Sequence, residues 1–348
     1  RGIYNGMSAK KTVEQLNERY KDGDGKFITR RATREDFGTN PCSEIILRSR
    51  EFCNLSECVV RREDTRESLK EKVRTAAILG TFQSTLTEFK YLSREWKKNC
   101  DEERLLGVSL TGIMDNPLTN GSKKGLDTLL EELRDIAYET NKEWADKLGI
   151  PVSAAITCVK PSGTVSQLVD SASGIHARHN PHYIRTVRAD NKDPLCKLMQ
   201  DMGFPNEVDI TKPEHTTVFS FPQKSPKGAT CRNDMTALEQ LELWKVYAES
   251  WCEHKPSVTI SVKEDEWVEV AAWVYDHFDS ISGISFLPFS EHVYRQAPYQ
   301  DCTEEEYKEA LKTMPKNVDW AELSKYESQD YTIASQELAC TAGGCEII

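Results

Sequence analysis

The stretch Asn40-Pro41-Cys42-Ser43-Glu44 carries the strongest signal in this 348-residue chain, and a second thiol follows at Cys53. In an extended segment, side chains two residues apart project from the same face. Asn40, Cys42 and Glu44 have this spacing, so we expect an amide, a thiol and a carboxylate to meet one ligand. Free cysteine is also among the most buried residue types. A catalytic group and a buried structural thiol therefore both fit this stretch taken alone.

The composition is that of a protein with a sizeable core and an acidic surface, since 38% of the residues are hydrophobic, 29% are charged and the net charge is -11. An acidic surface disfavours nucleic acid as a partner. No apolar run approaches the roughly 18–20 residues of a membrane-spanning helix, and no signal peptide is visible. The eleven cysteines are spread along the chain, which predicts a reducing, cytoplasmic setting. Because residue 1 is arginine, we expect a fragment or a processed product.

Helical and extended patterns alternate along the chain. Helices are predicted at 8–21, 66–96, 126–148, 236–251, 265–278 and 303–314. Strands are predicted at 104–110, 154–159, 257–262 and 283–287. This alternation indicates an α/β architecture with parallel strands, either a barrel or a doubly wound sheet.

A candidate anion-binding loop follows the predicted strand at 154–159 and consists of Pro161, Ser162, Gly163, Thr164, Val165 and Ser166. Free backbone N–H groups and the helix dipole favour an anion at a helix start, and Gly163 lets the backbone approach a phosphate closely. An ordinary helix cap after a proline turn explains the same residues. Both interpretations stay open from the loop alone.

The chain ends on a second cysteine pair, Cys340 and Cys345, separated by Thr-Ala-Gly-Gly. A structural zinc site needs four ligands, and this segment offers two thiols with no histidine nearby. The glycines and the terminal position favour a redox shuttle over two incidental cysteines.

Together these motifs resemble the catalytic subunit of adenosylcobalamin-dependent (class II) ribonucleotide reductase, in particular the ribonucleoside-triphosphate reductase type. The resemblance runs essentially along the whole chain, and its motifs lie at 40–44, 52–55, 160–164 and 182–185 and at the terminal cysteine pair. It implies a ten-stranded α/β barrel with a finger loop in its centre. This chain would be the carboxy-terminal part of such a subunit.

The resemblance also implies chemical roles. Cys42 would become a thiyl radical, started by adenosylcobalamin, and would remove the 3′ hydrogen of the ribose. Glu44 would accept the 3′-hydroxyl proton as a general base, and Asn40 would hold the ribose hydroxyls. Cys53 would be one member of the reducing dithiol, and residues 161–166 would cradle the substrate phosphates. The expected reaction is reduction of ribonucleoside triphosphates to 2′-deoxyribonucleoside triphosphates for DNA synthesis.

Partners and domains follow from the same resemblance. Cys340 and Cys345 would reduce the active-site disulfide and would be recharged by thioredoxin or a similar dithiol. The catalytic barrel is expected at 1–333 and a mobile redox tail at 334–348. The family's amino-terminal half, with the first strands, the second thiol of the dithiol and the region for dNTP or ATP effectors, is missing. We therefore expect this chain to be inactive by itself.

Three other functions stay open, one of them a degenerate reductase fragment that only binds nucleotide. A class II reductase that acts on diphosphates has a similar pattern; the triphosphate type is favoured because the chain ends just after Cys345 without a cysteine cluster. A non-catalytic, thiol-rich protein that binds metal through cysteine and histidine would contain zinc and would not respond to cobalamin. Neither the residues that contact cobalamin nor a metal site can be assigned from the sequence.

Overall fold

The structure of the chain, a computed structural model, describes residues 2–20, 25–26, 29–281, 283–289 and 294–327. The chain divides into two compact units. Unit 1 comprises Arg1–Arg178 with Gly228–Phe289, and unit 2 comprises His179–Lys227 with the described part of Ser290–Ile348. The sequence prediction did not make this division within 1–333. The predicted tail at 334–348 lies outside the described residues.

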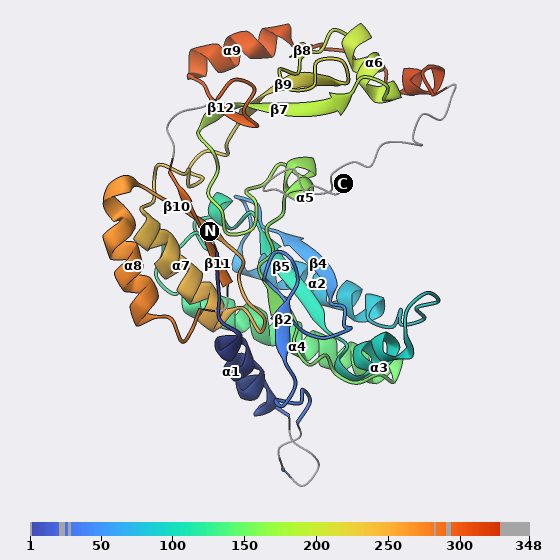
Figure 1. The fold of residues 1–348 in the computed structure, drawn as a ribbon, viewed down its shortest axis with the longest axis vertical. Helices are drawn as coiled ribbons and strands as arrows, with labels where there is room; N and C mark the ends of the chain where they lie inside the picture. Colours follow the sequence, from blue (N-terminus) through green and yellow to red (C-terminus); the bar gives the residue numbers. More distant parts are fainter. Residues whose placement is uncertain (1, 21–24, 27–28, 282, 290–293, 328–348) are drawn as a thin grey trace. The chain divides into compact units, whose positions relative to one another are not determined.

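Unit 1 is built on parallel strands (Figure 1). In spatial order its strands are β4 (Asn54–Val59), β5 (Leu106–Thr111), β6 (Thr157–Cys158), β10 (Thr259–Val262), β11 (Gly283–Pro288) and β1 (Gly2–Tyr4). A parallel bridge between Val159, just after β6, and Pro256, just before β10, joins the sheet β4-β5-β6 to the sheet β10-β11-β1. All neighbours in this order are parallel except β1, which runs antiparallel to β11. The expected α/β class is therefore confirmed, whereas a closed barrel is not formed by the described residues.

The longer helices of unit 1 cover these strands and bury apolar residues against them. The helices of unit 1 are α1 (Gly6–Asn17), α2 (Arg66–Gln83), α3 (Arg94–Glu103), α4 (Leu126–Leu148), α5 (Thr164–Leu168), α7 (Ala237–Ser250) and α8 (Trp267–Asp276). α2 packs on β4 and β5, α4 packs on α2 and α7, and α7 packs on β10 and α8. β5 is buried along its whole length, and its Leu, Val and Leu side chains alternate with the small residues Gly107, Ser109 and Thr111, which fit where little space is left.

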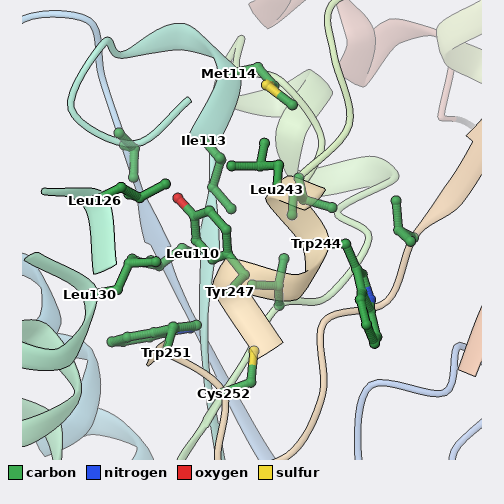
Figure 2. Packing of buried hydrophobic residues seen from close by; sticks show 14 of the residues in the cluster. Leu110, Ile113, Met114, Leu126, Leu130, Leu243, Trp244, Tyr247, Trp251 and Cys252 are labelled. Atoms are coloured by element: carbon green, nitrogen blue, oxygen red, sulfur yellow. The ribbon is translucent and has the colours of Figure 1, made fainter. Parts of the chain in front are cut away.

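The core of unit 1 lies between β5, α4 and α7 (Figure 2). The aromatic residues of α7 and its end fill it, and each polar atom that they bury finds a backbone carbonyl. Trp251 Nε1 donates to Cys158 O at 2.7 Å, and Tyr247 Oη donates to Thr119 O at 2.8 Å. These bonds fix the position of α7 relative to β6 and to the loop that precedes α4.

Unit 2 has a different construction. Its four-stranded sheet is antiparallel throughout, in the order β12 (Tyr299–Asp301), β7 (His182–Asp190), β9 (Thr216–Lys224) and β8 (Asn206–Val208). Its helices are α6 (Pro194–Asp201) and α9 (Glu304–Thr313). A small apolar cluster around Cys196, Phe204 and Phe219 forms its core. The expectation of parallel strands holds for unit 1 and is wrong for unit 2.

One predicted helix is two in the structure. The sequence pattern predicts a single helix at 66–96, but α2 ends at Gln83 and α3 begins at Arg94. The Ser84 hydroxyl donates to Thr81 O, and the Thr85 hydroxyl donates to Phe82 O, both at 2.7 Å. Hydroxyls that bond the last carbonyls compete with the next helical turn and end the helix. The apolar period of the sequence continues beyond this point, and for that reason it predicts a helix that is too long.

We expect Leu110→Ala to lower the free energy of unfolding by about 2–5 kcal/mol, because it leaves a cavity in a closely packed core. Leu110 is fully buried in β5, whereas Leu86 is 71% exposed. The matched change Leu86→Ala should stay within about 0.5 kcal/mol. Urea unfolding followed by circular dichroism measures both. Equal effects of the two substitutions would contradict the placement of β5 at the centre of unit 1.

Candidate active site

Cys42 and Glu44 lie in the connection of a short hairpin formed by β2 (Phe37–Thr39) and β3 (Ile46–Arg48). The connection is a tight turn rather than an extended segment. Ser43 N donates to Asn40 O at 2.9 Å, and Ser43 adopts a left-handed backbone conformation, with φ of 66°. The premise of alternating side chains on one face is therefore wrong. Asn40 instead supports the turn, since its Oδ1 accepts from Ile45 N at 3.0 Å.

Contacts from distant segments hold this hairpin. Lys255 N donates to Glu44 O at 2.9 Å, and an Arg31 guanidinium nitrogen donates to Ile46 O at 2.9 Å. His254 bridges the hairpin to the central sheet. Its Nδ1 accepts from Ile46 N at 3.3 Å, and its Nε2 bonds Leu106 O at 2.9 Å. A carbonyl can only accept, so the proton of the neutral ring lies on Nε2.

The environment of His254 keeps this ring neutral. Burial and the nearby Arg31 charge lower its pKa to about 3. A protonated ring would carry a hydrogen on Nδ1 and would lose the bond from Ile46. The neutral state is thus the one that holds the hairpin in place.

Glu44 is completely buried, which is costly for a carboxylate unless a charge or hydrogen bonds compensate. Its Oε1 pairs with Lys160 Nζ at 3.1 Å. Its other oxygen, Oε2, has no hydrogen-bond partner within the part of the chain that the structure describes. One carboxylate oxygen is therefore available to a hydrogen-bond donor that the described residues do not supply.

Cys53 lies beside this carboxylate, immediately before β4. It packs against Leu105, Ala154 and Ala155. Burial raises the pKa of its thiol well above the ordinary value, and the charges of Glu44 and Glu51 raise it further. The absence of a side chain at residue 107 makes room for it, because a Cβ on Gly107 would lie 3.2 Å from Cys53 Sγ.

Cys42 is partly exposed at the turn. It is close enough to Lys160 for its thiolate charge to contribute to the raised pKa of that lysine, which the Glu44 carboxylate raises more strongly against the lowering effect of burial. The structure thus brings Cys42, Glu44, Cys53 and Lys160 together in unit 1. The roles assigned to Asn40, Cys42, Glu44 and Cys53 remain predictions.

The loop at 161–166 begins directly after Lys160. Its two buried hydroxyls are used inside the loop, because Ser162 Oγ accepts from Ser166 N at 3.0 Å and the Ser166 hydroxyl donates to Ser162 O. Gly163, Thr164 and Val165 are exposed, and no atom lies within 4 Å of a Cβ built on Gly163. The surface of the loop is open to a ligand, and phosphate binding there stays a prediction.

Sequence reasoning missed three groups of this site. Lys160 is part of a motif used for the resemblance, but nothing in the sequence indicates its contact with a carboxylate over a hundred residues away. His254 shows no motif at all. A buried charge cluster of Arg31, Glu51 and Glu103 also went unnoticed, with Arg31 Nε 2.7 Å from Glu103 Oε2. Burial and Glu103 raise the pKa of Glu51 to about 9.

The remaining predicted features are not part of this group of residues. Cys340 and Cys345 lie outside the described residues. Among the described residues no group of three or more His, Cys, Asp or Glu side chains could hold a metal ion, and no helix has the length and apolarity to cross a bilayer. A cavity of about 570 Å³ lies between α1, α7 and α8, where Lys11 and Lys245 line it, and Cys42, Glu44 and Cys53 do not.

We expect the free energy of unfolding to decrease as pH is lowered, because His254 must then take up a proton. Its folded-state pKa of about 3 lies below the ordinary 6.5, so the unfolded chain binds a proton that the folded chain does not. The contribution of the neutral ring is complete above pH 6.5 and is lost as pH falls towards 3, by up to about 1.4 kcal/mol per pH unit. His254→Gln should flatten urea-measured stability between pH 6.5 and 4.5, relative to wild type. His215→Gln, at an exposed histidine, should leave the wild-type slope; equal slopes in all three proteins would refute the bridge.

Comparison with known proteins connects this site to a family. No family model matches the sequence. The adenosylcobalamin-dependent ribonucleoside-triphosphate reductase of Euglena gracilis is 30% identical over 283 residues, which are 81% of this chain and 38% of that protein. The enzyme of the same name from Lactobacillus gasseri is 27% identical over 341 residues, 89% of this chain and 45% of that protein. The chain spans less than half the length of these curated relatives.

Solved structures support the fold. A B12-dependent (class II) ribonucleotide reductase superposes with a TM-score of 0.75 at 23% identity, covering 95% of this chain and 48% of the other. The class Id ribonucleotide reductase alpha subunit of Actinobacillus ureae gives 0.53 at 13% identity, covering 83% and 58%. The resemblance expected from the motifs is confirmed. Along most of its length this chain is similar to part of an adenosylcobalamin-dependent ribonucleoside-triphosphate reductase.

Proposed function

We propose that this chain is the part of an adenosylcobalamin-dependent ribonucleoside-triphosphate reductase that carries the thiyl cysteine and the general base. One observation carries the proposal: the fully buried Glu44 keeps one oxygen without a partner among the described residues, beside Cys53 and on the same turn as Cys42. A carboxylate in this condition is suited to accept a proton from a bound hydroxyl. The similarity to reductases of that name supports the substrate class.

The strand order supports a barrel that further strands complete. β4 and β1 are the two edges of the unit 1 strand series among the described residues, and an exposed edge offers unpaired backbone groups to another strand. The relatives are more than twice as long as the matched segment. We assign to that additional length the strands that close a ten-stranded barrel around the β2–β3 hairpin, which would be the finger loop.

In the proposed reaction the chain's own residues act on the ribose. The thiyl form of Cys42 takes the 3′ hydrogen atom, and Glu44 Oε2 takes the 3′-hydroxyl proton. The 2′-hydroxyl leaves as water with one further proton, and a dithiol supplies two electrons while it becomes a disulfide. Cys53 is one thiol of that pair, and its partner lies outside this chain. Cys42 finally returns the hydrogen atom to C3′.

Cofactor, phosphates and reductant complete the proposal. Adenosylcobalamin supplies the radical that generates the Cys42 thiyl, and Cys42 fits this requirement because its side chain is partly exposed at the turn. Residues 161–166 bind the triphosphate through the open backbone of Gly163, Thr164 and Val165. Cys340 and Cys345 return electrons from thioredoxin, dNTP or ATP effectors act through the remainder of the protein, and the enzyme works in the cytoplasm.

We expect Cys42→Ser in the full-length protein to reduce turnover to background, because an alcohol O–H bond is too strong for reversible hydrogen exchange with a sugar carbon. The assay is conversion of CTP to dCTP with adenosylcobalamin and a dithiol. Cys302→Ser is the matched control, since Cys302 has the same intermediate exposure but belongs to unit 2. That variant should keep wild-type activity.

The same assay separates the alternatives. Faster reduction of CDP than of CTP would replace the triphosphate by a diphosphate substrate. Stoichiometric zinc, with no reduction of either nucleotide when adenosylcobalamin is added, would favour a thiol-rich metal-binding protein. Full turnover by Cys42→Ser would remove the thiyl from this residue.

A further inference from the structure

We propose that Lys160 is the positioning residue that keeps Glu44 ionised and leaves its Oε2 oxygen to the substrate. This inference deepens the proposed function and rests on it, because Glu44 needs to be an acceptor only if the hairpin reduces a ribose. Lys160 acts through Glu44 and is assigned no contact with the reacting atoms.

The geometry gives Lys160 one fixed place. Its Nζ lies 3.1 Å from Glu44 Oε1, and its backbone N–H donates to Ser109 Oγ at 2.8 Å. Ser109 belongs to the fully buried strand β5, so the backbone of Lys160 is tied to the rigid centre of unit 1. The ammonium group engages Oε1 alone, which orients the carboxylate and leaves Oε2 without a partner among the described residues.

The charge balance around Glu44 depends on this lysine. The Glu44 carboxylate acts on the thiols of Cys53 and Cys158, and Cys42 lies close to its partner Lys160. Burial raises the pKa of the Cys53 and Cys158 thiols well above the ordinary value, so both are neutral near pH 7. Lys160 is the cation that the structure shows in an ion pair with Glu44. A carboxylate buried without such a charge takes up a proton.

A protonated Glu44 could not accept the 3′-hydroxyl proton. The balance of the step is therefore simple: the hydroxyl O–H bond breaks, a new O–H bond forms at Glu44 Oε2, and Lys160 keeps all its protons throughout. Lys160 also precedes the loop at 161–166 directly. The base and the candidate phosphate site are consequently held by one continuous segment, which fixes the distance between the reacting end of a substrate and its phosphates.

The test compares two neutral substitutions, Lys160→Met and Lys160→Gln, with the charge-conserving Lys160→Arg. In the full-length enzyme we expect the acidic limb of kcat/KM against pH to move up by about 1–3 pH units in both neutral variants. Lys160→Arg should restore the limb to near its wild-type position. Lys72→Met is the matched control, because Lys72 also pairs with a carboxylate and its side chain is 35% exposed, as is that of Lys160. Its limb should not move.

A second readout needs neither cofactor nor turnover. Alkylation of Cys42 by iodoacetamide, quantified on the Cys42 peptide by mass spectrometry, reports its thiolate at each pH. The positive charge of Lys160 interacts with the Cys42 thiolate. Both neutral variants should therefore shift the midpoint of alkylation to higher pH, and Lys72→Met should not. An unchanged midpoint in both would overturn the placement of Lys160.

The two proposals fail in different ways. An unmoved acidic limb in both neutral variants, in an enzyme that Cys42→Ser inactivates, overturns the role of Lys160 and leaves the reductase intact. Turnover retained by Cys42→Ser overturns the proposed function and with it the need for an ionised Glu44. A limb that moves equally in Lys160→Arg would also overturn the inference, because the charge is conserved there.

Discussion

The β2–β3 hairpin can place the polar side chain of Glu44 in the interior because the buried backbone groups of the hairpin form hydrogen bonds with residues from elsewhere in the chain. A buried amide or carbonyl without a partner costs about as much as a lost hydrogen bond. Here Lys255 bonds the Glu44 carbonyl, and His254 and Arg31 bond the two polar groups of Ile46. Arg31 precedes β2 in the sequence, whereas His254 and Lys255 lie more than 200 residues later, between β6 and β10. The position of Cys42 is therefore a property of folded unit 1 rather than of the turn itself.

Charge arrangement makes those contacts mutually dependent. Arg31 bonds Ile46 O and also pairs with Glu103, and its positive charge contributes to the low pKa of His254. The neutral ring of His254 can then accept from Ile46 N. A loss of Arg31 would accordingly remove its hydrogen bond to Ile46 O. It would also make His254 easier to protonate, and protonation removes the bond from Ile46 N. Buried charges of this kind contribute little net stability, but they select one position of the hairpin.

Local sequence carried some of this information and not the rest. The helix at 126–148 was predictable to its bounds, because its apolar period ends at Gly149, which closes α4 with φ of 65°. Helix 66–96 was not, because hydroxyls at Ser84 and Thr85 end α2 while the apolar period continues. Unit 2 escaped prediction because its two long strands β7 and β9 show no regular alternation of buried and exposed side chains, so the period of two that marks a strand is missing. The Asn-x-Cys-x-Glu spacing drew attention to Cys42 and Glu44, whose roles stay predictions, but it implied an extended backbone where the structure has a turn.

Long-range pairing is what no local pattern encodes. The contact between Glu44 and Lys160 joins residues 116 positions apart, and the bond between His254 and Leu106 joins residues 148 positions apart. Each of these residues is unremarkable in its own segment: a lysine before a proline, and a histidine in a polar run. Their roles arise because the parallel strands β5, β6 and β10 place the ends of distant segments side by side, as parallel sheets commonly do.

The same packing sets the chemical state of Cys53. Its thiol pKa is raised by burial and by two neighbouring carboxylates, so the sulfur keeps its hydrogen near pH 7 and is a poor nucleophile. Such a thiol is suited to give a hydrogen to a radical and is unsuited to start thiol–disulfide exchange, which requires a thiolate. In the proposed cycle the exchange must therefore begin with an external thiolate. Because a sulfur of high pKa is also a poor leaving group, that thiolate should attack the sulfur of Cys53 and release its partner, which makes the approach to Cys53 the step that any reductant has to satisfy.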